Sequence, residues 1–96
     1  MAFNIIIDTR AFEDIDVAVE YYHKISPSLS KRFISEIRKT IKILSKNPFF
    51  QIRYKDYRCL VVKKFPYMFH YIVDEEKNRV VIYGLRNTSQ NADKWL

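Results

Sequence analysis

The sequence predicts an α+β domain in which an N-terminal strand and a pair of helices pack against a small sheet. Two stretches of the first half carry apolar residues at helical spacing. Two β-rich runs near the C-terminus flank the polar turn Glu75–Asn78, which is typical of a hairpin. Helices followed by a series of strands indicate an α+β fold with the helices on one face of the sheet. The 96 residues suit a single domain spanning residues 1–96.

The opening segment predicts a strand that leads directly into a helix. Phe3–Ile7 is rich in β-branched residues, which favour extended backbone. Asp8 or Thr9 is suited to cap the following helix, because its side-chain oxygen can accept a hydrogen bond from a free backbone N–H. We expect this helix to end near Lys24 or Ile25.

A second helix is predicted from Pro27 to the pair Asn47-Pro48. Ser26 is a common capping residue, and proline is favoured at the first helical position. Proline after asparagine then stops the helix, because it cannot continue the hydrogen-bond ladder. The short link between the two helices favours an antiparallel α-hairpin.

The second half of the chain predicts strands. Arg58–Lys64 is typical of a strand, whereas Phe49–Lys55 fits either a strand or an extended loop. Pro66 turns the chain, because proline lacks the N–H that a central strand needs. Met68–Val73 and Val80–Leu85 then pair as an antiparallel hairpin.

The positive charge is concentrated in the middle of the chain. The formal net charge is +6, yet residues 31–64 alone hold eleven Lys/Arg and two Asp/Glu, which gives +9. Such a block attracts phosphate backbones or an acidic protein partner. A solvated basic face without a specific partner is the alternative.

Cationic and aromatic residues from this block onward are the candidate nucleic-acid contacts. Lysine and arginine neutralise phosphates, and tyrosine stacks on bases. Tyrosines in a β-rich domain are also common packing residues. The candidates are Lys42, Lys46, Arg53, Lys55, Lys63, Lys64 and Tyr67.

His70 is the candidate proton-transfer group of the C-terminal hairpin. Side chains alternate across a strand, so His70 shares a face with Met68 and Ile72. Phe69 and Tyr71 point the other way and are expected in the core. A histidine on an open face beside arginines can move a proton in phosphodiester cleavage. A half-buried histidine satisfied by a neighbour is the alternative.

Two arginines complete the candidate catalytic set of Arg58, His70 and Arg86. Arg58 lies near the start of one predicted strand, and Arg86 lies where another ends. A guanidinium group can clamp a phosphate through paired hydrogen bonds. For Arg86, an ordinary exposed arginine is the alternative.

The composition disfavours several other kinds of site, and no metal or cofactor is expected. One cysteine and two histidines give no zinc-ligand spacing, and a single glycine cannot form a phosphate-binding glycine loop. A nucleophilic pair of Cys59 with His70 lacks a third orienting group, so a buried inert thiol is the better interpretation. The lone cysteine suits a reducing cytoplasm, and no run of about 20 apolar residues predicts a membrane span.

A series of short motifs runs through the chain in order. They are Thr9-Arg10-Ala11, Asn47-Pro48, Tyr57-Arg58, Phe65-Pro66-Tyr67, Thr88-Ser89 and Asp93-Lys94-Trp95. Their order and spacing resemble the RelE/ParE superfamily of toxins from bacterial type II toxin–antitoxin modules, often labelled plasmid stabilisation proteins. The resemblance implies a small curved antiparallel sheet with an α-hairpin packed against it. It also implies a growth-inhibiting toxin with a cognate antitoxin as partner.

The resemblance implies two alternative targets. RelE-like members cut mRNA on the ribosome, where cationic side chains stabilise charge on the phosphate. ParE-like members inhibit DNA gyrase and need no nuclease residues. The basic block and His70 favour ribosome-dependent mRNA cleavage, which would make the chain an endoribonuclease. A degenerate, non-toxic partner or regulator is the third possibility.

Three residues depart from the pattern of the nuclease branch. Met68 stands where RelE-like nucleases tend to carry arginine. Asn87 and Gln90 stand where relatives with this terminal motif usually have histidine and arginine. Asparagine cannot act as a general acid or base near neutral pH. These departures favour the gyrase alternative and keep both mechanisms open.

Overall fold

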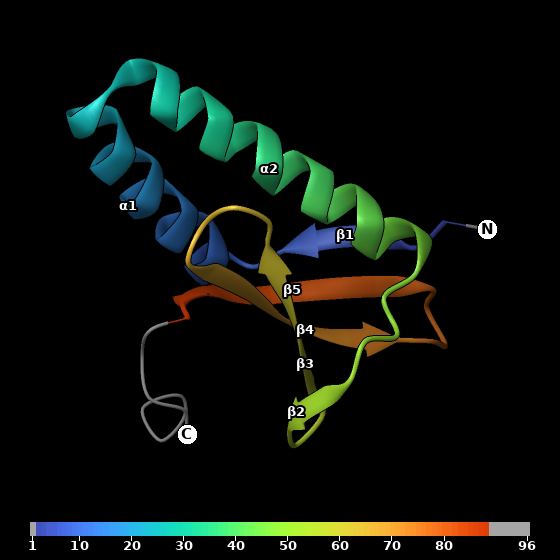
Figure 1. The fold of residues 1–96 in the computed structure, drawn as a ribbon. Coiled ribbons are helices and arrows are strands. Elements are labelled where there is room, and N and C mark those ends of the chain that lie inside the picture. The colour runs from blue at the N-terminus through green and yellow to red at the C-terminus, as the bar shows by residue number, and fades with distance from the viewer. Residues whose placement is uncertain (1, 89–96) are drawn as a thin grey trace.

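A computed structural model describes residues 2–88 as two helices layered on one face of a five-stranded sheet (Figure 1). The helices are α1 (Thr9–Ile25) and α2 (Pro27–Lys46), and they form the predicted α-hairpin. The α+β class is therefore confirmed. No helix among residues 2–88 is both long and apolar enough to cross a membrane.

The sheet contains β1 (Asn4–Ile7), β2 (Ile52–Tyr54), β3 (Tyr57–Val62), β4 (Tyr67–Asp74) and β5 (Arg79–Asn87). Its strand order is β1-β5-β4-β3-β2. The strands from β2 to β5 are antiparallel to their neighbours, as expected, but β1 pairs in parallel with β5. The sheet is therefore mixed, with one parallel pair at its β1 edge.

The helix boundaries follow local capping chemistry. Asp8 is the N-cap of α1, and its Oδ1 accepts a hydrogen bond from the Arg10 N–H at 2.9 Å. Pro27 occupies the first position of α2, while the Ser26 side chain makes no capping bond. The C-cap of α2 is Asn47, in agreement with the predicted stop. The first helix, α1, packs beside β5.

The core lies between the helices and the sheet. Phe33 from α2 and Phe69 and Tyr71 from β4 are fully buried there, as the strand alternation predicts. The Tyr71 hydroxyl donates a hydrogen bond to the Pro48 carbonyl at 2.8 Å. This bond ties the segment after α2 to the middle of the sheet.

A bulge interrupts the pairing of β4 with β5. His70 is opposite Gly84, but the next residue, Tyr71, is opposite Ile82. Tyr83 is therefore the extra residue of β5, and a bulge of this kind bends the strand and increases its twist. The bulge lets Ile82 and Leu85 both face the core, although they are three positions apart.

Candidate functional site

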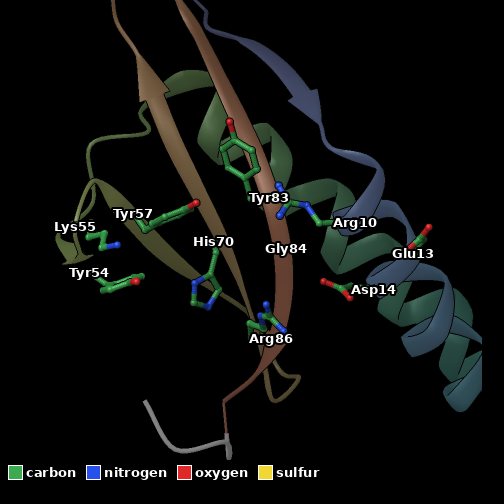
Figure 2. A pocket seen from close by; sticks show the side chains of 10 residues that line it. All are labelled: Arg10, Glu13, Asp14, Tyr54, Lys55, Tyr57, His70, Tyr83, Gly84 and Arg86. Atoms are coloured by element: carbon green, nitrogen blue, oxygen red, sulfur yellow. The ribbon is translucent and has the colours of Figure 1, made fainter. Parts of the chain in front are cut away.

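The face of the sheet that the helices leave uncovered carries a hollow of about 420 Å³ (Figure 2). Strand residues form most of its lining, and the first turns of α1 close one side. The lining residues are Arg10, Glu13, Asp14, Tyr54, Lys55, Tyr57, His70, Tyr83, Gly84 and Arg86. The hollow thus combines tyrosine rings, cations and two carboxylates.

His70 lies in this hollow and contacts Cys59. The Cys59 Sγ atom is 3.7 Å from His70 Nδ1, which is within reach of a weak sulfur hydrogen bond. Burial lowers the pKa of His70, and the positive charges of Arg86 and Arg53 lower it further, against a smaller opposing effect of Asp14. A neutral imidazole is thereby favoured, so His70 is suited to accept a proton rather than to supply one.

The thiol of Cys59 is not activated by this contact. Burial raises the pKa of Cys59, and the opposing effect of Arg53 is smaller. A raised thiol pKa and a lowered imidazole pKa favour the neutral pair over the thiolate–imidazolium pair that nucleophilic catalysis needs. The geometry therefore supports an inert thiol beside His70.

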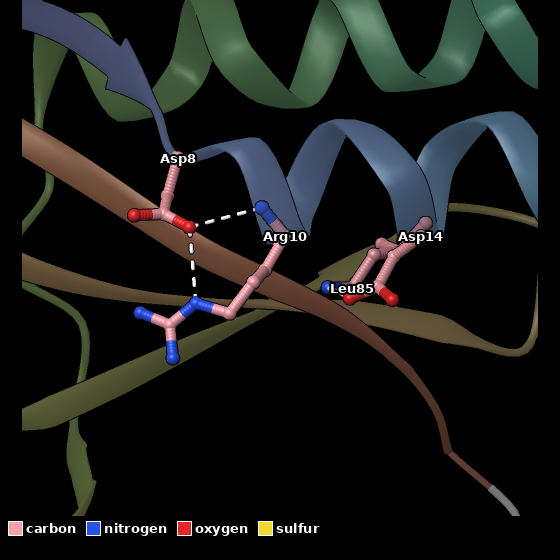
Figure 3. Close-up of polar contacts among 4 residues, drawn as sticks. All are labelled: Asp8, Arg10, Asp14 and Leu85. Carbon is pink, nitrogen blue, oxygen red and sulfur yellow. Dashed lines mark hydrogen bonds and ion pairs between the residues drawn. The ribbon is translucent and has the colours of Figure 1, made fainter.

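Asp14 of α1 fixes the end of β5 that carries Arg86. Its Oδ2 atom accepts a hydrogen bond from the Leu85 N–H at 3.0 Å, and Figure 3 shows the carboxylate beside that residue. A Cβ atom at Gly84 would lie 3.3 Å from the same oxygen, so the absence of a side chain there permits the close approach. Asp14 therefore holds the backbone of β5 at the residue next to Arg86.

A second contact holds Arg10 over the hollow. The Arg10 Nε atom is 3.0 Å from Asp8 Oδ1 (Figure 3). The guanidinium carbon lies 5.5 Å from the centre of the Tyr83 ring, which is cation–π distance. The backbone N–H and guanidinium of Arg10 lower the pKa of Asp8, so this carboxylate stays ionised beside the arginine.

Three tyrosines form a row across the hollow, which we call the tyrosine row: Tyr54, Tyr57 and Tyr83. The rings of Tyr54 and Tyr57 are stacked, with centroids 5.8 Å apart. Tyr57 meets Tyr83 edge to face at 5.9 Å, and the Lys55 Nζ atom lies 5.3 Å from the Tyr54 ring centre. Exposed aromatic faces with cations above them can bind a planar or anionic group.

The three candidate catalytic residues do not come together. His70 and Arg86 line the same hollow, but Arg58 is paired with the core residue Tyr71 and leaves the sheet on the helix side. The Arg58 guanidinium donates a hydrogen bond to the Phe50 carbonyl and lies over the Phe49 ring. Arg58 thus fastens the segment between α2 and β2, away from His70.

The seven nucleic-acid candidates are distributed over separate surfaces. Lys55 lines the hollow, and Arg53 on β2 is close enough to influence His70. Tyr67 instead packs on the helix side of the sheet, with its ring 5.5 Å from that of Phe33. The remaining four are exposed on α2 and on the turn from β3 to β4: Lys42, Lys46, Lys63 and Lys64.

Several residues of the hollow were not among the sequence candidates. Tyr54, Tyr57, Arg10 and Asp14 were missed because their positions depend on strand register and on the approach of α1. The motifs containing Arg10 and Tyr57 were the signal that could have found two of them. Within residues 2–88, no group of three or more His, Cys, Asp or Glu side chains is placed to hold a metal ion.

Comparison with known proteins identifies the family. A family model described as the ParE toxin of the type II toxin–antitoxin system parDE matches residues 5–92. The chain belongs to this ParE toxin family. The matched region includes both helices, all but the first residue of the sheet and every residue of the hollow. The resemblance to the RelE/ParE superfamily is therefore confirmed.

Solved structures share the fold of this ParE-family chain at low sequence identity. The chromosomal ParDE system of P. aeruginosa gives a TM-score of 0.79 at 15% identity, with 91% of this chain and 97% of that chain covered. The RelBE2 toxin–antitoxin complex of Mycobacterium tuberculosis gives 0.61 at 18% identity, with 91% and 99% covered. Isolated E. coli RelE gives 0.60 at 14% identity, with 98% and 93% covered. The search of curated proteins found no significant match to the sequence.

Proposed function

We propose that this protein is a growth-inhibiting toxin that a cognate antitoxin neutralises, and that it acts by binding DNA gyrase without cutting RNA. Membership of the ParE family supports the gyrase target. The higher TM-score with the ParDE system than with RelE supports the same branch. The similar proteins include toxin–antitoxin complexes, which supports the antitoxin partner.

The separation of Arg58 from His70 and Arg86 is the observation that carries the proposal. Cleavage of a phosphodiester needs cations and a proton-transfer group around one phosphate. Arg58 lies on the other side of the sheet, where Phe50 occupies its guanidinium. Met68, where nuclease relatives tend to carry arginine, is buried opposite Arg86 and adds no charge. The open face therefore suits binding better than phosphoryl chemistry.

Expression in cells without an antitoxin tests the proposal. We expect growth arrest and DNA damage signalling, with no new mRNA 5′ ends. In vitro, the purified chain should inhibit supercoiling by gyrase. New in-frame mRNA cuts after induction would overturn the gyrase assignment, and normal growth would indicate the degenerate, non-toxic alternative.

Ribosome-dependent mRNA cleavage is the second candidate function. It is favoured by the position of His70, Arg86 and Lys55 in one hollow. If this route operates, His70→Gln or Arg86→Gln should abolish the mRNA cuts, because each removes a group from the hollow. Arg58→Gln is the matched control, and it should keep the cuts if the variant remains folded by circular dichroism.

A further inference from the structure

Six cationic side chains of α2 lie on a single face of the helix, which we call the basic face of α2. They are Lys31, Arg32, Arg38, Lys39, Lys42 and Lys46. With 3.6 residues per turn, their positions fall within an arc of about 120°. All six residues are exposed. The arc points directly away from the buried side of the helix, which carries Phe33, Ile37 and Leu44.

The basic face is not neutralised by nearby carboxylates. Glu36 is the only acidic residue of α2, and it lies outside the arc with 9% of its surface exposed. Its Oε2 atom is 3.6 Å from Lys39 Nζ. Among residues 2–88, the other five cations of the face have no ion pair within 4 Å. The uncharged Ser28 and Ser35 complete the arc.

The turn between β3 and β4 adds cations to one border of the basic face. Lys64 faces a groove of about 380 Å³ that Arg32 and Lys39 also line. Lys64 has a φ of 71°, a left-handed conformation that is uncommon for residues other than glycine. Lys64 therefore adds one positive charge beside the basic face of α2, in a groove that Glu36 also lines.

The length and shape of the basic face select the kind of anion that fits it. A helix of 20 residues is about 30 Å long, and the cations occur from its second turn to its last residue. This spread suits a long, regular polyanion better than a single phosphate or a short acidic segment. The major groove of B-form DNA admits an α-helix between two rows of phosphates, whereas that of A-form RNA is too narrow.

We propose that the basic face of α2 binds the phosphate backbone of double-stranded DNA without regard to base sequence. In Figure 1, α2 runs along the outside of the molecule, and β2 lies on the opposite side of the molecule. The surface is therefore separate from the hollow with His70 and can be occupied at the same time. The inference goes beyond the proposed function and does not require gyrase to be the target.

Fluorescence anisotropy of the full chain with a labelled 20-bp duplex of mixed sequence tests this inference. The affinity should fall steeply with salt, with a log–log slope of about −0.9 for each neutralised phosphate. Arg38→Gln with Lys42→Gln should reduce the magnitude of that slope by about 2, because two contacts are lost. Glutamine preserves helix propensity, so α2 should remain folded.

The matched control is Lys24→Gln with Lys77→Gln, which removes the same charge from exposed positions off the face. It should leave the slope close to that of the unchanged chain. Equal losses in both double variants would reduce the effect to net charge and overturn the inference. Tighter binding of a 20-bp RNA duplex, or of a labelled Glu-rich peptide of 20 residues, would also overturn the DNA assignment. Because gyrase is absent, this assay is independent of the proposed target.

Discussion

Two aromatic clusters lie on opposite faces of the sheet and differ in what surrounds them. On the helix side, Tyr22, Phe33, Phe65 and Tyr67 form edge and tilted contacts with centroids 5.0 to 6.3 Å apart. On the open side, the tyrosine row has similar spacings, but Arg10 and Lys55 lie over its rings.

The difference shows that aromatic side chains of this chain occur in two environments, a closed core and an open face with cations. Phe33 is fully buried, so its ring stabilises the fold through contacts on all sides. Tyr54 and Tyr57 are only partly buried, and Lys55 lies over the ring of Tyr54. Ring spacing alone therefore does not distinguish the two clusters, whereas burial and neighbouring charge do.

Removal of Phe33 should have the largest effect on stability. Phe33→Ala leaves a cavity among Tyr22, Phe65 and Tyr67, and we expect a loss of about 4 kcal/mol in the free energy of unfolding. Tyr57→Ala is the matched change in the tyrosine row and should cost about 1 kcal/mol, because the site is open to water. Urea denaturation measures both. Equal losses would show that the tyrosine row is part of the core.

Removal of the Asp14 carboxylate should have the next largest effect. Asp14→Ala leaves the Leu85 N–H without its charged acceptor, so we expect a loss of about 2 kcal/mol in the free energy of unfolding. Asp16→Ala changes an exposed carboxylate on the same helix and should stay within about 0.5 kcal/mol. Thermal and urea denaturation compare the two. A cost for Asp16→Ala as large as for Asp14→Ala would point to helix charge instead.

Much of the fold was predictable because its signals are local. The cap at Asp8, the proline at the start of α2 and the stop at Asn47 depend on neighbouring residues only. The core positions Phe69 and Tyr71 follow from simple alternation along β4. The parallel pairing of β1 could not be predicted in this way, because it joins segments more than 70 residues apart.

The site was harder to predict because it depends on register. Simple alternation would place Leu85 on the face opposite Ile82, yet the bulge at Tyr83 brings both to the core. Arg58 was grouped with His70 as a strand cation, but its pairing with Tyr71 fixes it on the other face. A single residue of register separates a core contact from a site contact.

Removal of the Tyr71 hydroxyl tests how much the hydrogen bond from the core to the segment after α2 stabilises the fold. Tyr71→Phe removes the hydrogen bond to Pro48, and we expect a loss of about 1 kcal/mol at neutral pH. Burial raises the pKa of Tyr71 to about 12 from its usual 10.0. The stabilising contribution of the neutral phenol should therefore persist below pH 10 and disappear as the pH rises toward 12. Urea denaturation at pH 7 to 12 measures this contribution. As the pH rises, the free energy of unfolding should fall less steeply for Tyr71→Phe than for the unchanged chain. Parallel pH curves for the two proteins would contradict this account.

The smallest expected effect is a shift in the titration of His70 on the open side. Burial and the charges of Arg86 and Arg53 lower the pKa of His70, so its NMR titration midpoint should lie below 6.5. The unfolded chain then binds this proton more readily, so the contribution of His70 to stability is present above pH 6.5 and is lost as the pH falls. Arg86→Gln should raise the midpoint because it removes one of the positive charges, whereas Lys77→Gln, an exposed change in the turn after β4, should not.

The titration is best followed in a His23→Gln background, which leaves one histidine signal. A midpoint at or above 6.5 would mean that the imidazole is solvated or paired with a carboxylate. In that case the hollow would favour the charged imidazolium, and His70 would be suited to donate a proton to a leaving group. A low midpoint that rises in Arg86→Gln would instead show that the positive charge of Arg86 favours the neutral imidazole of His70. On the helix side of the sheet, Glu36 is the one charged residue among the buried residues of the range 2–88, so that side has no counterpart to this arrangement.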